Sequence, residues 1–144
     1  LDKAGCFEVE TGELAATPPV QCWAQLAAAR IDADDPLRRH KTTARQRYDE
    51  ALRALPAAAG VFDAIFLNQR GEVAEGARST VFVERDGVLL TPPLTSGALP
   101  GVLRASLLAS GQARESVLRP VDLGDGFFLG NALRGLIRVS LSAD

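Results

Sequence analysis

The stretch FDAIFLNQRGEVAEGARSTVFV, residues 62–83, decides the fold class. Residues 62–67 are a short apolar run with the length of a buried strand. Residues 68–71 have the composition of a turn, and residues 72–75 begin a return strand that residues 80–83 continue. The centre of the chain is therefore predicted to be a β-sheet of short strands joined by turns.

The segments around this centre add two helices and several strands. Apolar side chains three and four residues apart predict a helix over residues 42–55, capped by Thr42 or Thr43. A second helix is predicted over residues 102–110 and ends at Gly111. Strands are expected at 88–90 after the Asp86-Gly87 turn, 116–121, 127–129 and 136–141, with a hairpin at 6–15 and a strand or helix at 20–29. The predicted fold class is α/β (mixed α+β), a curved sheet backed by a few helices.

Composition and charge argue against several classes of protein. The chain has 144 residues, enough for one compact domain, with 47% hydrophobic and 24% charged residues, as in soluble globular proteins. The net charge is −2 without a basic stripe, so we expect no nucleic-acid partner. No apolar run approaches the roughly 20 residues that span a bilayer, so we expect no membrane insertion.

Metal and triad chemistry are also disfavoured. Cys6 and Cys22 form no C-x-x-C pair, and His40 is the only histidine, so no metal site is expected. A Ser-His-Asp triad would depend on His40, and no nucleophile-elbow pattern accompanies it. We expect reduced thiols and a cytoplasmic location.

Two residues could carry chemistry on local grounds. Lys41 directly precedes the first predicted helix, whose positive N-terminal end favours the neutral amine that Schiff-base chemistry requires. A solvated lysine at a helix start is the commoner interpretation. Glu75 follows a short strand and precedes Gly76, where a carboxylate could face a pocket, although a surface glutamate is again commoner.

Two backbone segments are candidate ligand contacts. Pro100-Gly101 opens the second predicted helix, and the N–H groups of Val102 and Leu103 in its first turn would form an anion site. An ordinary helix start is the alternative. Gly130-Asn131 separates two apolar runs, either as a simple turn or as a loop that approaches a ligand.

The order and spacing of these stretches resemble the class IV aminotransferase family, the fold type IV pyridoxal-phosphate (PLP) enzymes. The likeness covers about residues 36–140. It is carried by residues 40–43 with Arg45 and Tyr48-Asp49, by 63–68 with 71–76, by 79–83, by 91–92 with 99–104, and by 128–136. It implies that residues 31–144 are the larger, PLP-binding C-terminal domain, a curved sheet or pseudo-barrel. Residues 1–30 would be the inter-domain crossing and first strands. The small N-terminal domain would be largely absent, and a chain that starts at Leu1 without Met is expected to be a fragment.

The resemblance also implies the roles of individual residues. Lys41 would hold PLP and move the proton at the substrate α-carbon, which makes it the catalytic residue. Glu75 would face the pyridine nitrogen. The remaining implied cofactor-binding residues are Arg45 near the cofactor, and Gly101, Val102, Leu103, Gly130 and Asn131 around the phosphate.

Within the family, His40-Lys41-Thr42-Thr43 and the ending Gly-Asn-x-Leu-Arg-Gly at 130–135 most resemble the 4-amino-4-deoxychorismate lyase branch. This branch implies formation of 4-aminobenzoate and pyruvate in folate biosynthesis, from a small amino-acid-like substrate. A homodimer is expected. The branch also implies a chorismate-binding synthase component that is fused to the chain or acts with it. A branched-chain or D-amino acid aminotransferase and a non-catalytic domain that keeps the fold are the alternatives. A coincidental match in an unrelated α/β domain would place Lys41 and Glu75 on opposite faces.

Overall fold

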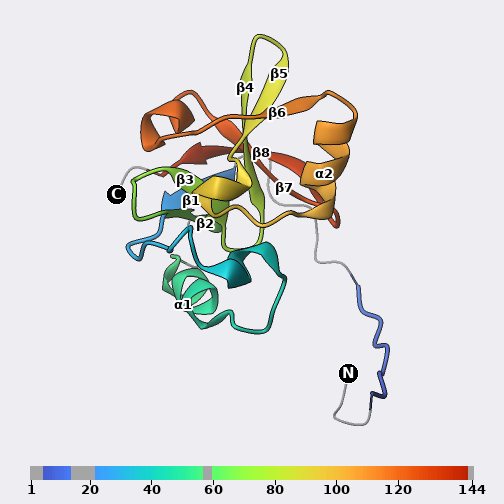
Figure 1. The fold of residues 1–144 in the computed structure, drawn as a ribbon. Coiled ribbons are helices and arrows are strands. Elements are labelled where there is room, and N and C mark those ends of the chain that lie inside the picture. The colour runs from blue at the N-terminus through green and yellow to red at the C-terminus, as the bar shows by residue number, and fades with distance from the viewer. Residues whose placement is uncertain (1–4, 14–21, 57–59, 143–144) are drawn as a thin grey trace.

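The computed structural model describes residues 5–13, 22–56 and 60–142, and its centre is one curled sheet (Figure 1). Within these residues the sheet has eight strands in the order β3-β2-β1-β8-β7-β4-β5-β6. The strands are β1 (Cys22–Leu26), β2 (Val61–Leu67), β3 (Val73–Gly76), β4 (Thr80–Arg85), β5 (Val88–Thr91), β6 (Ala113–Glu115), β7 (Phe127–Asn131) and β8 (Gly135–Leu141). The helices are α1 (Gln46–Ala54), α2 (Val102–Ala109) and the short 3-10 helices η1 (Pro36–Arg39), η2 (Leu94–Ser96) and η3 (Pro120–Leu123). The predicted fold class, a curved mixed sheet with a few helices, is confirmed.

The sheet joins distant parts of the chain. β1 lies between β2 and β8 and is parallel to both, and β5 is parallel to β6, while the other neighbours are antiparallel. The β4–β5 hairpin confirms the predicted turn, since Asp86 and Gly87 have φ values of 52° and 77°, as a two-residue hairpin turn requires. Among the described helices, none is long and apolar enough to cross a membrane.

The expected continuation of the return strand through residues 80–83 was wrong. Gly76 N–H donates to Ser79 O at 2.8 Å, which closes a tight turn after β3. β3 pairs with β2, whereas β4 turns away and pairs with β5 and β7. The chain is therefore sharply reversed just after Glu75.

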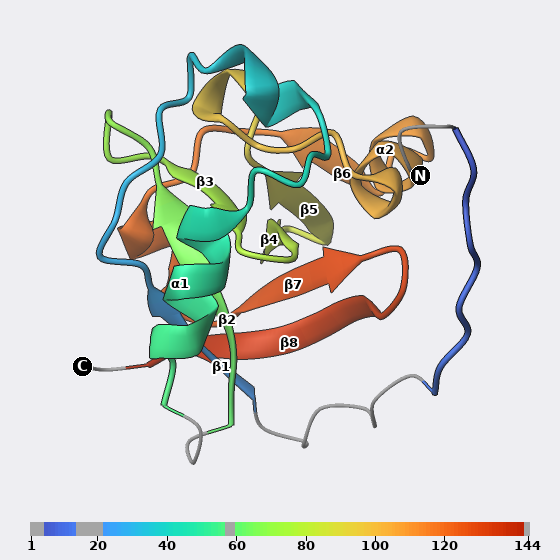
Figure 2. The same ribbon diagram turned by 90° about the horizontal axis from the view of Figure 1, so that it is seen from below.

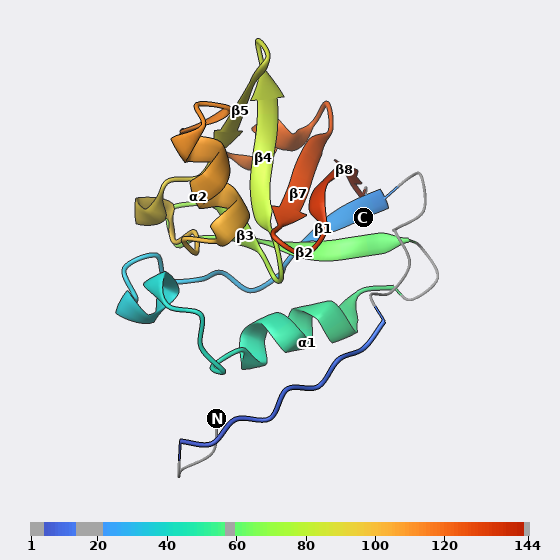
Figure 3. The same ribbon diagram turned by 90° about the vertical axis from the view of Figure 1, so that its right-hand side faces the viewer.

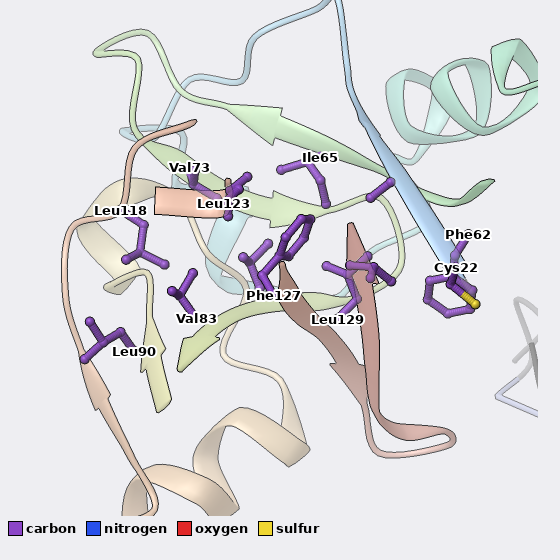
Figure 4. Close-up of a cluster of buried hydrophobic side chains, with 13 residues drawn as sticks. Cys22, Phe62, Ile65, Val73, Val83, Leu90, Leu118, Leu123, Phe127 and Leu129 are labelled. Atoms are coloured by element: carbon purple, nitrogen blue, oxygen red, sulfur yellow. The ribbon is translucent and has the colours of Figure 1, made fainter. Parts of the chain in front are cut away.

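The main core fills the inside of the curled sheet (Figure 4). Ile65, Val73 and Phe127 meet there from three different strands. On the other face of β2, Ala64 and Phe66 belong to a second cluster that includes side chains of α1. Both faces of β2 are thus covered, which explains why it is apolar at every position but Asp63. Figures 2 and 3 show α1 beside β2, and Figure 2 shows α2 on the side of the sheet that carries β6.

The predicted start of the first helix was wrong. α1 begins at Gln46, and its N-cap residue Arg45 makes no side-chain capping bond. Neither Thr42 nor Thr43 caps the helix, and Thr42 Oγ1 accepts from the Ala44 N–H at 3.3 Å within the preceding loop. Lys41 therefore lies in a loop rather than directly before a helix.

Two predicted strands also differ from the structure. The segment 116–121 forms no strand, because β6 ends at Glu115 and Pro120, with its fixed φ, opens η3. Residues 6–13 contain no strand, and the rest of that expected hairpin, residues 14–15, lies outside the described residues. Of the segment 20–29, residues 22–26 form β1, and residues 20–21 lie outside the described part.

Candidate active site

All the residues predicted for the cofactor site line one cavity of about 850 Å³. Its walls come from the η1–α1 loop, the β3–β4 turn, the start of α2 and the β7–β8 turn. The predicted residues in this lining are Lys41, Arg45, Glu75, Gly101, Val102, Leu103, Gly130 and Asn131. Lys41 and Glu75 thus share one cavity, which contradicts the interpretation that placed them on opposite faces.

Lys41 reaches this cavity by a different route from the one predicted. It lies between η1 and α1, five residues before Gln46, so the argument from the helix dipole, which acts only over the first turn, does not apply. Its side chain is exposed and makes no hydrogen bond or ion pair with any residue in the described ranges. The amine is therefore open to a ligand in the cavity.

Glu75 is a buried carboxylate held by two elements, with 8% of the residue exposed. Its Oε2 accepts from the Leu99 N–H at 2.9 Å, and its Oε1 accepts a short hydrogen bond from the Tyr48 hydroxyl. Burial raises the pKa of Glu75, and these two hydrogen bonds oppose that rise. Arg38 Nη1 lies 3.8 Å from Oε1 and favours the ionised carboxylate.

Tyr48 and Arg38 are site residues that the sequence analysis did not assign. The Tyr48 ring packs edge-on against Phe66, with a centroid separation of 5.0 Å. The Arg38 guanidinium lies 5.3 Å from the same ring and also donates to the Tyr48 hydroxyl. Burial, followed by the charge of Glu75, raises the pKa of Tyr48, so the hydroxyl stays protonated and donates to the carboxylate. Tyr48 stands in one of the stretches that carry the resemblance and is the only tyrosine of the chain, but neither signal assigned it a role.

The start of α2 contributes backbone N–H groups to the cavity wall. Gly101 is its N-cap and supplies no side-chain acceptor for the first turn. The N–H groups of Val102 and Leu103 have no partner within the helix and lie at the cavity wall. β7 approaches closely here, since a Cβ on Gly130 would lie 2.7 Å from Leu103 Cδ2.

Arg45 and Asn131 bind the protein itself with their side chains. Arg45 Nη2 donates to Ala77 O at 2.7 Å. Asn131 Nδ2 donates to Arg78 O at 3.1 Å, and its Oδ1 accepts from the N–H groups of Leu133 and Arg134 at 3.1 Å and 3.0 Å. These side chains thus shape the cavity wall, and their contact with a cofactor stays a prediction.

The cavity carries a clear excess of positive charge. Its lining includes the cations Arg38, Arg39, Lys41, Arg45, Arg78 and Arg134. The acidic residues in the lining are Asp35 and Glu75, so the lining contains six cationic and two acidic residues. Two of the cations have partners outside the lining, since the Arg78 guanidinium donates to Phe62 O and Arg45 pairs with Asp49 at 3.7 Å. A concave site of this kind favours ligands with several negative charges.

These groups match what the resemblance requires for PLP. The cavity offers an amine on Lys41, a buried carboxylate on Glu75 and a helix start for a phosphate. The close approach at Gly130 also brings β7 against the first turn of α2.

Comparisons with known proteins agree with this geometry. The profile of the family "Amino-transferase class IV" matches residues 12–141. A Mesorhizobium loti structure, provisionally named an amino-acid aminotransferase, is 42% identical with a TM-score of 0.78, covering 83% of this chain and 59% of that one. A Legionella pneumophila structure, provisionally named a 4-amino-4-deoxychorismate lyase, is 28% identical with a TM-score of 0.78, covering 92% of this chain and 51% of that one.

A curated relative shows a shorter match. The branched-chain-amino-acid aminotransferase of Escherichia coli K12 is 45% identical over 49 residues, which are 34% of this chain and 16% of that protein. The chain spans little more than half the length of the two solved structures. The fold is that of the larger, C-terminal domain of fold type IV enzymes. The chain belongs to the amino-transferase class IV family, whose members depend on PLP.

Proposed function

We propose that this chain is the PLP-binding part of a 4-amino-4-deoxychorismate lyase. The observation that carries the proposal is the set of six cations against two carboxylates in the cavity lining. The substrate of that lyase has two carboxylates, and the cofactor adds a phosphate. A branched-chain amino acid has one carboxylate and an apolar side chain, and it gives no reason for so many cations.

We propose a separate role for each group of residues that lines the cavity. We assign the phosphate to the N–H groups of Val102 and Leu103, and the pyridine nitrogen to Glu75. When bound, PLP supplies an electron sink for the negative charge left after proton removal. Lys41 has no other partner among the described residues, so its amine is available to hold the cofactor and to take the proton from the reacting carbon. Departure of enolpyruvate from the neighbouring ring carbon then gives aromatic 4-aminobenzoate and pyruvate.

Further parts of the active protein are proposed from the rim of the cavity. Leu37, Val102 and Leu133 line it and are 53%, 74% and 69% exposed. Apolar side chains gathered at a functional site are typically covered by another part of the protein. We infer that a small N-terminal domain and the second subunit of a homodimer cover them. We also propose a cytoplasmic role in folate biosynthesis, with a chorismate-binding synthase component fused to the chain or acting with it.

An aminotransferase is the second candidate, favoured by the 45% identity over 49 residues with the Escherichia coli enzyme. A transaminase consumes a 2-oxo acid acceptor, whereas the lyase needs none. Substrate tests therefore separate the two. 4-Amino-4-deoxychorismate without acceptor should yield equal amounts of 4-aminobenzoate and pyruvate, and leucine with 2-oxoglutarate should yield no glutamate.

The cofactor assignment has a direct test. The chain is incubated with PLP and reduced with borohydride, and the modified residue is located by mass spectrometry. Lys3 is the only other lysine, so Lys3→Ala is a matched control for Lys41→Ala. We expect a pyridoxyl group on Lys41 in the wild type and in Lys3→Ala, and none in Lys41→Ala. An intact fold without any adduct, also in a longer form of the protein, would favour the non-catalytic domain.

A further inference from the structure

Asp63 is a buried carboxylate that the proposed chemistry does not use. It lies on β2, is 0% exposed and does not line the cavity. Its Oδ1 accepts from the Ala64 N–H at 2.8 Å, and its Oδ2 accepts from the Ser79 hydroxyl at 2.5 Å. A fully buried carboxylate is costly to a fold unless its hydrogen bonds compensate, so its position calls for a structural reason.

The partners of Asp63 Oδ2 belong to the turn between β3 and β4, residues 76–79. Asp63 Oδ2 also accepts from the Arg78 N–H, at 3.4 Å. A Cβ on Gly76 would lie 2.5 Å from both Asp63 Oδ2 and Ser79 Oγ, so the carboxylate rests directly against the turn. Ala77 N–H donates to Ala64 O at 2.8 Å, which attaches the turn to β2 a second time.

The other side of this turn forms the cavity wall. All four of its residues line the cavity, and Glu75 immediately precedes it. Its carbonyl groups accept the hydrogen bonds from Arg45, at Ala77 O, and from Asn131, at Arg78 O. Three residues from the start of α1, from β3 and from β7 thus meet at one turn, whose inner side is bonded to Asp63.

We infer that Asp63 is a positioning residue, which fixes the turn at residues 76–79 and thereby places Arg45, Glu75 and Asn131 at the cavity. The expected effect of Asp63 on PLP binding rests on the proposed function. Its expected effect on the geometry of the cavity wall does not.

Asp63→Asn is the test variant. It keeps the size of the side chain and an acceptor for Ala64, but its amide nitrogen cannot accept from the Arg78 N–H. Thr91→Val is the matched control, because Thr91 is also 0% exposed, donates to Val81 O at 2.9 Å and does not line the cavity. Amide hydrogen exchange without cofactor and the dissociation constant of PLP are measured for both variants and the wild type.

The Arg78 N–H donates to Asp63, and the Gly76 and Ala77 N–H groups donate to Ser79 O and Ala64 O. We expect these three amides to exchange about tenfold faster or more in Asp63→Asn, and not in Thr91→Val. The dissociation constant of PLP should rise about tenfold in Asp63→Asn and less than about twofold in the control. Equal changes in both variants, or none in Asp63→Asn, would overturn the inference.

The test stays decisive if Asp63→Asn does not fold or if the wild type binds no PLP. In the first case, Ser79→Ala removes one of the same hydrogen bonds. We then expect the same local pattern of amide exchange with a smaller amplitude, and a uniform change in exchange would overturn the inference. If the wild type binds no PLP, the proposed function fails, and the exchange data still decide whether Asp63 fixes the turn.

Discussion

Replacement of Gly130 by alanine should disturb the proposed phosphate site without removing a polar side chain. The added Cβ would lie 2.7 Å from Leu103 Cδ2 and 3.0 Å from both Gly135 O and Leu136 Cδ2. The two leucine side chains can move, whereas the backbone oxygen of Gly135 is fixed by the pairing of β7 with β8. Strain is therefore expected to push the first turn of α2 away from β7.

The size of this effect follows from the contacts. Overpacking of a well-packed site costs about 1–3 kcal/mol of unfolding free energy. For a chain of this size, that loss lowers Tm by about 3–10 °C. If about half of the strain falls on the first turn of α2, the affinity for PLP falls about threefold to tenfold.

The assay pairs thermal unfolding with a PLP titration, and Gly124→Ala is the control. Gly124 has a φ of −61°, and a Cβ there would meet only Val121 O at 3.5 Å. That variant should be as stable as the wild type or more stable by about 0.5 kcal/mol. A Gly130→Ala protein that matches Gly124→Ala in both measurements would refute the reasoning.

Three further predictions concern the buried polar groups. Tyr48→Phe removes a donor to Glu75 and should lower the unfolding free energy by about 1–3 kcal/mol in urea denaturation; an unchanged value would mean that this bond contributes nothing. Gly76→Ala places a methyl group 2.5 Å from Asp63 Oδ2. It should lower the unfolding free energy by about 3 kcal/mol or more, which is a larger loss than in Gly130→Ala, and a smaller loss would contradict this. Burial raises the pKa of Asp63 in the folded state above its value in the unfolded chain. The unfolding free energy of the wild type relative to Asp63→Asn should therefore be greatest below about pH 4 and fall as pH rises through the folded-state pKa. The slope should be at most about 1.4 kcal/mol per pH unit. Urea denaturation between about pH 4 and pH 8 tests the last prediction, and a difference that grows with pH would count against it.

Local signals in the sequence predicted those elements whose structure is decided locally. The buried run of β2 and the Asp86-Gly87 hairpin were found because strand length and turn chemistry need no distant partner. The start of α1 was missed for the opposite reason. Residues 42–45 could continue the helix by composition, but Arg45 instead reaches Ala77 O, 32 residues away.

The candidate site was also predicted in part, and its missed residues likewise depend on distant contacts. Its membership was predicted from the order of several motifs, and all eight assigned residues line one cavity. Tyr48 and Arg38 were given no role because their local patterns are ordinary: Tyr48 lies on the apolar face of a helix, and Arg38 lies in the short, charged helix η1. Their role depends on Glu75, to which only the three-dimensional structure connects them.

Asp63 and Glu75 give the cavity wall an architecture that composition does not suggest. The strands that carry them are antiparallel neighbours, with Phe66 opposite Glu75 and Ile65 opposite Gly76. Both carboxylates are buried. Asp63 is bonded to the chain reversal at residues 76–79, and Glu75, which immediately precedes that reversal, is bonded to Tyr48 and Leu99. Apolar side chains would stabilise a sheet here at lower cost, since burial of a carboxylate is unfavourable until its hydrogen bonds are made. The pair is better explained by the fixed geometry it gives to the cavity than by any gain in stability.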